Sequence, residues 1–379
     1  MFMPMPKVPV PSSHVHPLTM FYALNLVIAL LVITVVGEII LWRWQHKTLH
    51  ITRPPLTVRG LLAWGLGGLW LIDGLLQLQP LMATDFGRGY LAALLRDQPQ
   101  VVAGIIRIGI HWWNLYPIFS DVAAAWLQIS IGALILFGGQ DRLKKLGLWT
   151  SIAWGIIVWI FGEALGGLLA APSWLVGSPG SALLYVMLAV LLLQPESSPW
   201  WGSKAAERWA RIIAGLWALA SFLQVWPADG WWRKDALVRY VRSMAAMPQP
   251  HLLSAGLEAW ARSLALHPLL WNAGLATIWM GLAVYWGFGR PTQHGWWGTA
   301  AMTFASWMFG QDFGFLGGLG TDSNSGLLLL LMLVGYAFSA KLFSLPSARA
   351  LGTPPPSQSH SSARGLLRHQ PQPGGEPRK

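Results

Sequence analysis

The sequence predicts an all-α, polytopic integral membrane protein with about nine transmembrane (TM) helices. Of its 379 residues, 54% are hydrophobic and only 11% are charged, whereas charged residues make up about 25% of an ordinary soluble chain. It contains 25 Trp residues, and Trp is enriched where a bilayer meets water. Several apolar stretches reach the roughly 20 residues that a helix needs to cross a ~30 Å hydrocarbon core.

A recurring motif predicts that the chain is a tandem duplication. The string Trp-x-Phe-Gly-Glu at 159–163 returns as Trp-x-Phe-Gly-Gln at 307–311. Each copy follows an apolar run and precedes a Gly/Ser loop and a Leu-rich run. We therefore predict one leading helix and two four-helix repeats. Because each repeat has an even number of spans, both copies insert the same way round, related by an axis along the membrane normal.

The predicted domains follow from this duplication. They are an extracytoplasmic tail (1–18), a leading TM helix (19–42), repeat 1 (61–195), repeat 2 (211–344) and a disordered cytoplasmic tail (345–379). The last segment is rich in Pro, Ser and Arg, a composition that cannot bury a core.

The individual spans are read from apolar runs in chain order. They are 20–42, 61–79, 118–137, 148–166, 181–194, 212–226, a span that opens at His267-Pro268 and ends before Arg290, 297–315 and 326–343. The stretches 82–117 and 228–266 mix Arg, His and Trp with apolar residues, a pattern typical of amphipathic helices at the outer interface.

Basic residues between the spans predict the orientation. They gather at 43–59, 142–145 and 204–211, and Lys and Arg favour cytoplasmic loops. We therefore expect the N-terminus outside, the C-terminus in the cytoplasm and a location in the cell membrane. The net charge of +11 then reflects these loops, and the lipid bilayer rather than nucleic acid is the expected partner.

Several kinds of chemistry are excluded by the residues themselves. The chain has no Cys, so it has no disulfide, thiolate metal site or cysteine nucleophile. No Ser-His-Asp set and no metalloprotease helix motif occurs. No strand is expected before any glycine pair, which excludes a nucleotide-binding loop.

Four features of repeat 1 resemble the DoxX/DoxD-like family of small four-helix membrane proteins. They are Gly74-Leu75-Leu76, the connection 90–100, the Gly/Leu-rich run 131–138 and the turn at Arg142-Leu143. The resemblance covers about three spans of each repeat. It implies a redox-associated role, since one member is a quinone-linked sulfur oxidase subunit, but it assigns no catalytic residues. The Trp-x-Phe-Gly motif and the long outer connections depart from the family pattern.

Polar residues near the outer ends of the spans are the candidate ligand-binding or proton-coupling groups. An ionisable residue inside a span costs roughly 2.5–3.5 kcal/mol, which makes it a functional candidate. If the repeats pack face to face, Glu163 meets Gln311 and Asp312 at the shared axis. Such a pocket could bind a cation, pass a proton or hold a quinone headgroup. The full set is Asp73, Asp121, Glu163, Asn272, Gln311, Asp312, Asp322 and Asn324.

The alternative for these residues is a structural role. Carboxylates and amides near span ends also cap helices and tie Gly-rich turns. The segment 321–326 has oxygen-bearing side chains but lacks the frame of a calcium-binding helix-loop-helix. We therefore expect Asn324 or Ser325 to cap the last helix.

Histidines offer a weaker metal hypothesis. His111 and His267 occupy comparable positions in the two repeats, and His14 and His16 lie near Met1, Met3 and Met5. Imidazole and thioether ligands suit haem iron or copper. The rich Trp and Pro surroundings favour interfacial anchoring for the first pair, and a Pro-rich tail readily produces the second cluster.

Three functions fit these observations. The first is a redox-associated membrane protein that binds a small hydrophobic ligand, with a quinone as the example, between its repeats near the outer surface. The second is a carrier of a small solute or metal ion coupled through carboxylates. The third is a structural subunit whose outer interfacial helices dock a partner. The sequence does not establish whether the protein is an enzyme.

Overall fold

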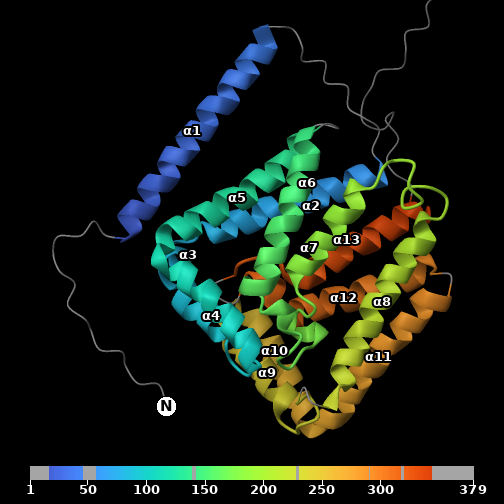
Figure 1. The fold of residues 1–379 in the computed structure, drawn as a ribbon. Helices are drawn as coiled ribbons and strands as arrows, with labels where there is room; N and C mark the ends of the chain where they lie inside the picture. Colours follow the sequence, from blue (N-terminus) through green and yellow to red (C-terminus); the bar gives the residue numbers. More distant parts are fainter. Residues whose placement is uncertain are drawn as a thin grey trace, which may run out of the picture. The chain divides into compact units, whose positions relative to one another are not determined.

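The protein is all-helical, as the sequence predicted. A computed structural model describes residues 17–45, 57–138, 142–227, 230–289, 291–316 and 320–343. Within these ranges thirteen α-helices and several short helical turns follow one another without a strand (Figure 1). His14, His16 and the predicted cytoplasmic tail lie outside the described residues.

Repeat 1 follows a long first helix, α1. Two turns of repeat 1, η1 and η2, are π-helical, and η2 continues α6 directly. The elements are α1 (Pro17–Gln45), α2 (Val58–Gln77), α3 (Pro80–Asp85), η1 (Phe86–Leu91), α4 (Gln100–Leu115), α5 (Pro117–Phe137), α6 (Arg142–Ile157), η2 (Val158–Gly162), η3 (Leu165–Gly167), η4 (Trp174–Val176) and α7 (Ser181–Leu193).

Repeat 2 has the same order of long helices but no π-helical turn among its described elements. Its elements are α8 (Ala205–Val225), α9 (Ala236–Ala245), α10 (His251–Leu266), α11 (Pro268–Phe288), α12 (Gln293–Gln311), η6 (Asp312–Gly314) and α13 (Asn324–Ser339).

Local sequence signals explain where several helices begin. Pro117 and Pro268 open α5 and α11, where the missing proline N–H loses no helical hydrogen bond. The Thr57 hydroxyl accepts the backbone N–H of Gly60 at 3.0 Å at the start of α2, and Thr292 caps α12 in the same way. Such caps satisfy N–H groups that a helix cannot satisfy itself.

Helices α2 and α5 pair closely, and α8 and α11 repeat this pairing. A Cβ atom added to Gly132 would lie 2.6 Å from the backbone oxygen of Gly67. The two backbones therefore touch at a point that only glycine allows. A second close approach lies at Gly74, whose added Cβ atom would lie 2.9 Å from the backbone oxygen of Ala125. At the matching positions of repeat 2, Ser221 Oγ donates to the backbone oxygen of Ala276 at 2.8 Å.

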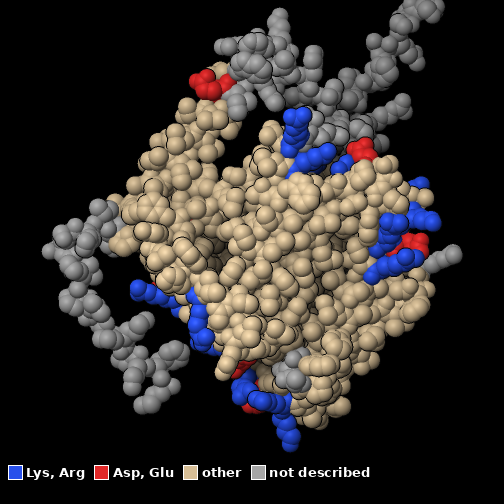
Figure 2. Space-filling model, in the orientation of Figure 1, with Lys and Arg blue, Asp and Glu red and all other residues tan. Residues whose placement is uncertain are grey.

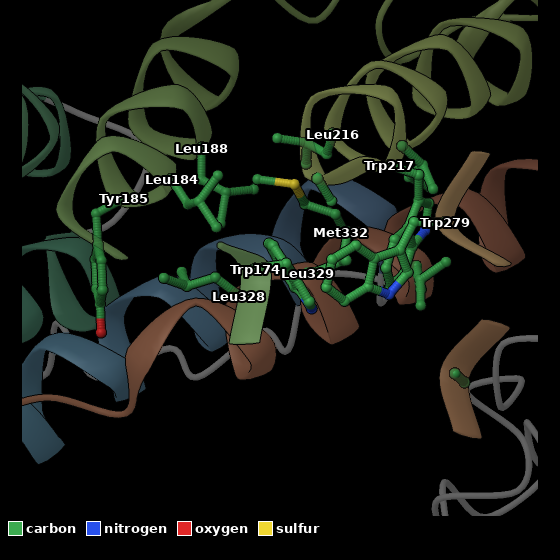
Figure 3. Close-up of a cluster of buried hydrophobic side chains, with 14 of the residues drawn as sticks. Trp174, Leu184, Tyr185, Leu188, Leu216, Trp217, Trp279, Leu328, Leu329 and Met332 are labelled. Carbon is green, nitrogen blue, oxygen red and sulfur yellow. The ribbon is translucent and has the colours of Figure 1, made fainter. Parts of the chain in front are cut away.

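The fourth helices of the repeats, α7 and α13, form the centre of the fold. Helix α13 contacts α2, α7 and α8, so it joins the two repeats. Leucines from α7 and α13 fill the space between them, with Met332 and three Trp residues beside them (Figure 3). The labelled members of this cluster are Trp174, Leu184, Tyr185, Leu188, Leu216, Trp217, Trp279, Leu328, Leu329 and Met332.

Five helical segments are long and apolar enough to cross a membrane. They are Pro17–Glu38, Val58–Gln77, Pro117–Phe137, Arg142–Gly162 and Pro268–Phe288. All nine expected spans coincide with helices, but the remaining four fall short by length or composition. Helix α7 has 13 residues, about 20 Å at 1.5 Å per residue. Helix α8 carries Glu207, Arg208 and Arg211 in its first turns.

Charged side chains are unevenly distributed over the surface. Lys and Arg gather towards the edges of the face shown in Figure 2, with a broad uncharged area between them. Arg59, Lys144 and Lys145, from two of the predicted inner loops, lie together with Glu196 in one small groove. Arg59 pairs with Glu196 at 3.3 Å.

The loops that precede α7 and α13 are exchanged between the repeats. Ser173 and Trp174 of repeat 1 reach repeat 2, where Ser173 Oγ donates to Gln224 Oε1 at 2.6 Å and Trp174 Nε1 donates to Ser306 Oγ at 3.1 Å. In return, the backbone oxygen of Gly320 accepts a hydrogen bond from Gln79 Nε2 at 3.1 Å in repeat 1. Each repeat is thus completed by a loop of the other.

Candidate functional site

The two copies of the Trp-x-Phe-Gly motif place their polar residue at the same structural point. Glu163 Oε1 accepts hydrogen bonds from Ser181 Oγ at 2.5 Å and from the backbone N–H of Ala182 at 3.0 Å. Gln311 Oε1 accepts the backbone N–H of Gly326 at 2.9 Å. Each side chain therefore caps the helix that follows, α7 in repeat 1 and α13 in repeat 2.

The backbone just after each motif takes left-handed conformations. In repeat 1 they begin at Ala164 and Leu165, with φ of 49° and 60°, and in repeat 2 at Asp312 and Phe313, with φ of 52° and 57°. The run of positive φ continues through Gly167 in repeat 1, which makes four consecutive residues, and through Gly314 in repeat 2, which makes three. Positive φ is costly for residues with a side chain, and such strain concentrates at functional sites. Gly166 is required in this turn, because a Cβ there would collide with the backbone of Pro179.

A cavity of about 550 Å³ opens beside the Glu163 motif. It lies among α2, η1, α4, α5, α6, η2 and α7 of repeat 1, and Thr321 and Asp322 of repeat 2 complete its wall. The sequence had predicted a pocket between the repeats. Leucines of α7 and α13 fill the central contact between the repeats. The cavity lies mainly within repeat 1, and repeat 2 contributes Thr321 and Asp322 to its wall.

Most of the cavity wall is aromatic or aliphatic. Both π-helical turns face it: Phe86 and Tyr90 come from η1, and Val158 and Phe161 from η2. π-Helical turns inside helices are rare and frequently lie at functional sites. The aromatic lining residues are Trp70, Phe86, Tyr90, Trp112, Trp113, Trp154, Phe161 and Tyr185.

Three carboxyl groups converge on the cavity. Asp73 on α2, Glu163 after η2, and Asp322 before α13 all line it. Tyr185 on α7 donates its hydroxyl proton to Asp73 Oδ2, and Figure 3 shows the Tyr185 hydroxyl directed away from the leucine cluster. Among the described residues that line the cavity, none is Lys, Arg or His. The carboxyl groups therefore have no protein cation to neutralise them there.

Burial changes the proton affinity of two groups that line the cavity, Asp322 from repeat 2 and Tyr90 from repeat 1. Burial raises the pKa of Asp322 above its usual range, and hydrogen bonds from its neighbours only partly oppose this. Burial, followed by the nearby Asp322 carboxyl, raises the pKa of the Tyr90 hydroxyl. Charged forms are costly in such surroundings because little solvent reaches them.

Several polar atoms around the cavity have no hydrogen-bond partner. Asp73 is only 2% exposed, and its Oδ1 is unpartnered although the backbone of Ser323 lies near. The other such atoms on the lining are Trp113 Nε1, Gln128 Oε1, Trp154 Nε1 and Glu163 Oε2. Buried polar groups normally find a protein, water or ligand partner, so this set marks a place that a bound molecule would satisfy.

A matched pair of hydrogen bonds aligns the two repeats residue by residue. Gln77 Nε2 donates to Asp121 Oδ1 at 2.5 Å between α2 and α5. Gln224 Nε2 donates to Asn272 Oδ1 at 2.5 Å between α8 and α11. All four side chains are buried. The same positions in the two helix pairs therefore hold the same contact.

This alignment shows that repeat 2 lacks the polar groups of the cavity. Four residues before the matched glutamine, repeat 1 has Asp73 and repeat 2 has Ala220. Four residues after the serine that opens the last helix, repeat 1 has Tyr185 and repeat 2 has Leu329. Gln311 likewise stands in place of Glu163. Each of these three titratable residues of repeat 1 therefore corresponds to a residue of repeat 2 that does not titrate.

The corresponding space in repeat 2 is filled by aromatic rings. Seven residues after the matched Asp121 or Asn272, repeat 1 has Gln128 and repeat 2 has Trp279, which is fully buried. Trp279 lies with Trp217 and with Trp174 from the exchanged loop (Figure 3). The Trp174 and Trp217 ring centroids are 5.5 Å apart. The space in repeat 1 is thus open and lined by acidic side chains, whereas the corresponding space in repeat 2 is filled by tryptophan rings.

The remaining sequence candidates fall outside the cavity. Asp121 and Asn272 hold helix pairs together, as described above. Asp312 is buried and neither of its carboxyl oxygens has a hydrogen-bond partner, but it does not line the cavity. Asn324 uses its own Oδ1 to cap the N–H of Ser325, while its backbone N–H donates to Asp322 Oδ1 at 2.6 Å.

The metal hypothesis gains no support from the described residues. His111 and His267 are exposed, one at the end of α4 and the other just before α11. Within the described ranges, no three His, Asp or Glu side chains are grouped so that they could hold a metal ion. His14 and His16 lie outside those ranges.

Sequence reasoning missed the aromatic part of the site. Tyr90 and Tyr185 were not singled out, because a tyrosine in an apolar run reads as an interfacial anchor. Comparing the repeats would have found Tyr185, since it aligns with Leu329 of repeat 2 in an otherwise matching Leu-rich helix. The π-helical turns left no signal in the sequence.

Comparison with known proteins adds no relative. No protein-family model matches this chain, and it matches neither a curated protein nor a solved structure. The resemblance to DoxX/DoxD-like proteins therefore stays a prediction.

Proposed function

We propose that this chain is an integral membrane protein whose first repeat binds a small, largely apolar ligand with a polar head. The observation that carries the proposal is the cavity of about 550 Å³ with an aromatic wall and three convergent carboxyl groups. Ligand sites are typically concave, mostly apolar and equipped with a few well-placed polar groups. In this description the ligand body lies against the Trp and Phe rings and its head meets Asp73, Glu163 and Asp322.

Membrane insertion is supported by the five long apolar helices and by the uncharged area between the charged edges (Figure 2). The short helices α7 and α13 fit this setting, because non-helical backbone at membrane depth is tolerated where protein or a cavity surrounds it. The turns after Glu163 and Gln311 are such backbone. Basic residues near Arg59 and Lys145 favour the cytoplasm on that side. We therefore infer that the cavity lies towards the outer side.

The absence of native cysteine provides a direct test of this orientation. Lys145→Cys and Lys234→Cys each introduce one exposed thiol, at opposite predicted sides. We expect a membrane-impermeant maleimide to label the second variant in intact cells and the first only after the cells are opened. Labelling of both thiols in intact cells would contradict the orientation.

Two ligand classes follow from the atoms that line the cavity. The unpartnered Trp113 and Trp154 N–H groups would donate to carbonyl oxygens such as those of a quinone, and this supports a redox-associated role. The carboxyl groups would serve a carrier that exchanges protons for its solute. Accumulation of a solute in proteoliposomes, against binding without transport, separates these two roles.

Binding itself can be tested with a neutral naphthalene dye that carries a carbonyl and fluoresces in apolar surroundings. Ala124 is 4% exposed and lines the cavity on α5, so Ala124→Trp should fill the space. Gly281 on α11 has no atom near its Cβ position, so Gly281→Trp adds the same ring outside the site. We expect saturable binding to the purified protein and to the Gly281 variant only. Equal binding by the Ala124 variant would overturn the proposal.

A further inference from the structure

We infer that the ligand of the repeat 1 cavity carries a positive charge on its apolar body, and that its binding releases a proton. The inference rests on the proposed function and specifies its ligand class. It follows from the groups that line the cavity with Asp73. The Tyr185 hydroxyl on α7 and the Glu163 and Asp322 carboxyl groups act on Asp73 directly, and the Tyr90 hydroxyl on η1 lies near the same two carboxyl groups. Every titratable group in this set is an acid, and no described residue on the lining is basic.

The contents of the cavity decide which headgroup it suits. A neutral ligand would leave three carboxyl groups facing one another without a counter-ion. A cation with an apolar body would meet a carboxylate at its charge and aromatic faces around its stem, the combination that recognises quaternary ammonium groups. The unpartnered Asp73 Oδ1, on a residue 2% exposed, lies where such a charge would be placed.

Proton release follows from the charge balance. Like charges in a site of low polarity cannot all ionise, so at least one carboxyl group holds its proton while the cavity is empty. A bound cation favours the ionised form of that group. The protonated acid and the free cation then become a carboxylate–cation pair and a proton in solution, which balances atoms and charge. Ligand binding and proton binding at this site therefore compete.

The second repeat supports the assignment. Ala220, Leu329 and Gln311 stand where repeat 1 has Asp73, Tyr185 and Glu163. The capping contact survives with an amide, since Gln311 Oε1 still accepts a backbone N–H. The fold therefore does not need acids at these positions, and their presence in repeat 1 alone points to a ligand that needs them.

The test uses two probes of equal shape: a naphthyl-hexyl chain ending in trimethylammonium, and the same chain ending in tert-butyl. Equilibrium dialysis against the full-length protein in micelles, corrected for empty micelles, gives both affinities. We expect the cation to bind at least tenfold more tightly. We also expect Asp73→Asn to remove that preference, while Asp312→Asn, at a buried carboxyl off the cavity, keeps it. A pH indicator in weak buffer should report proton release on binding of the cation and none on binding of the tert-butyl probe. Cation binding without proton release would overturn that part of the inference.

The outcomes separate this inference from the proposed function. Equal affinity for the two probes, with both displaced by Ala124→Trp, would overturn the cationic ligand and leave the binding cavity intact. A cation preference that persists in Asp73→Asn, Glu163→Gln and Asp322→Asn alike would also overturn the inference. Absence of binding by either probe above empty micelles would count against both proposals.

Discussion

At the scale of single residues, the site combines a structural contact with a chemical group in one side chain. Glu163 caps α7 through Oε1, while its Oε2 has no hydrogen-bond partner and faces a cavity with two other carboxyl groups. Capping requires only an oxygen acceptor, which an amide supplies equally well. The negative charge is a separate property that capping does not explain.

The two properties of Glu163 can be separated by substitution. We expect Glu163→Gln to change the free energy of unfolding by less than about 1 kcal/mol, because the amide oxygen still accepts the Ala182 N–H, as Gln311 does for Gly326. Glu163→Ala removes the cap and should cost about 1 kcal/mol. Thermal unfolding of the purified variants measures the difference. If Gln destabilised as much as Ala, capping by this side chain would be refuted.

The buried pair of Gln77 and Asp121 is predicted to be structural. Asp121→Asn should be tolerated within about 1 kcal/mol, since Asn272 does the same work in repeat 2. Asp121→Leu leaves the Gln77 amide buried without a partner and should cost about 1–3 kcal/mol. Chemical unfolding of both variants gives these values. Loss of probe binding in Asp121→Asn without loss of stability would instead assign this residue to the site.

At the scale of elements, the pairing of α2 with α5 sets the position of Asp73. Gly132 allows the two helices to touch through their backbones, and Asp73 then lies at the cavity end of α2. A wider spacing would move Asp73 relative to Tyr185. The glycines of this crossing therefore act on the site at a distance.

A glycine comparison tests this dependence. Gly132→Ala puts a Cβ atom 2.6 Å from the Gly67 oxygen and should destabilise the protein by about 1–3 kcal/mol, as overpacking does. Gly281→Ala meets open space and should stabilise α11 by up to about 1 kcal/mol through helix propensity. Unfolding midpoints of the two variants should move in opposite directions. A shift of both in the same direction would mean that the α2–α5 contact is not tight.

Some elements could be predicted from sequence and others could not. The all-helical class and the position of the long helices follow from the apolar runs, and the repeated motif predicts the matching order of α2, α5, α6, α7 and α8, α11, α12, α13. The central position of the short helix α7 could not be predicted, because an apolar run of this kind resembles an ordinary transmembrane span. Its length depends on the loop that precedes it. The position of the cavity could not be predicted either. The Leu-rich sequences of α7 and α13 are similar and do not indicate which side of each helix packs against the other repeat.

At the scale of the whole molecule, one repeat supplies a filled scaffold and the other an open site. The loops before α7 and α13 are exchanged, so Trp174 helps to fill repeat 2 while Asp322 joins the cavity of repeat 1. The two repeats differ at Asp73, Glu163 and Tyr185, where repeat 2 has Ala220, Gln311 and Leu329. The candidate list from sequence included Asp73, Glu163 and Asp322 because acids stand out in apolar runs, but it could not separate them from Asp121 and Asp312.

Replacing Asp73 and Tyr185 by the residues found at these positions in repeat 2 tests how the two side chains affect stability. Asp73→Ala alone leaves the Tyr185 hydroxyl without its acceptor and should destabilise the protein by about 1–3 kcal/mol. Adding Tyr185→Leu removes the second partner and should recover most of that loss, because replacing both members of a buried polar pair is often neutral or better. A double-mutant cycle on unfolding free energies measures the coupling. Additive losses would show that the two side chains do not interact.

The most direct test locates a bound molecule. A naphthyl-alkyl ammonium probe with a diazirine on its chain can be photolysed on the full-length protein and its adducts mapped by peptide mass spectrometry. We expect adducts within the segments 108–113 and 154–162, which contain lining residues such as Trp112 and Phe161, and their loss in Ala124→Trp but not in Gly281→Trp. Adducts concentrated on α8 and α11, or spread over α1 and unchanged by Ala124→Trp, would contradict a ligand cavity in repeat 1.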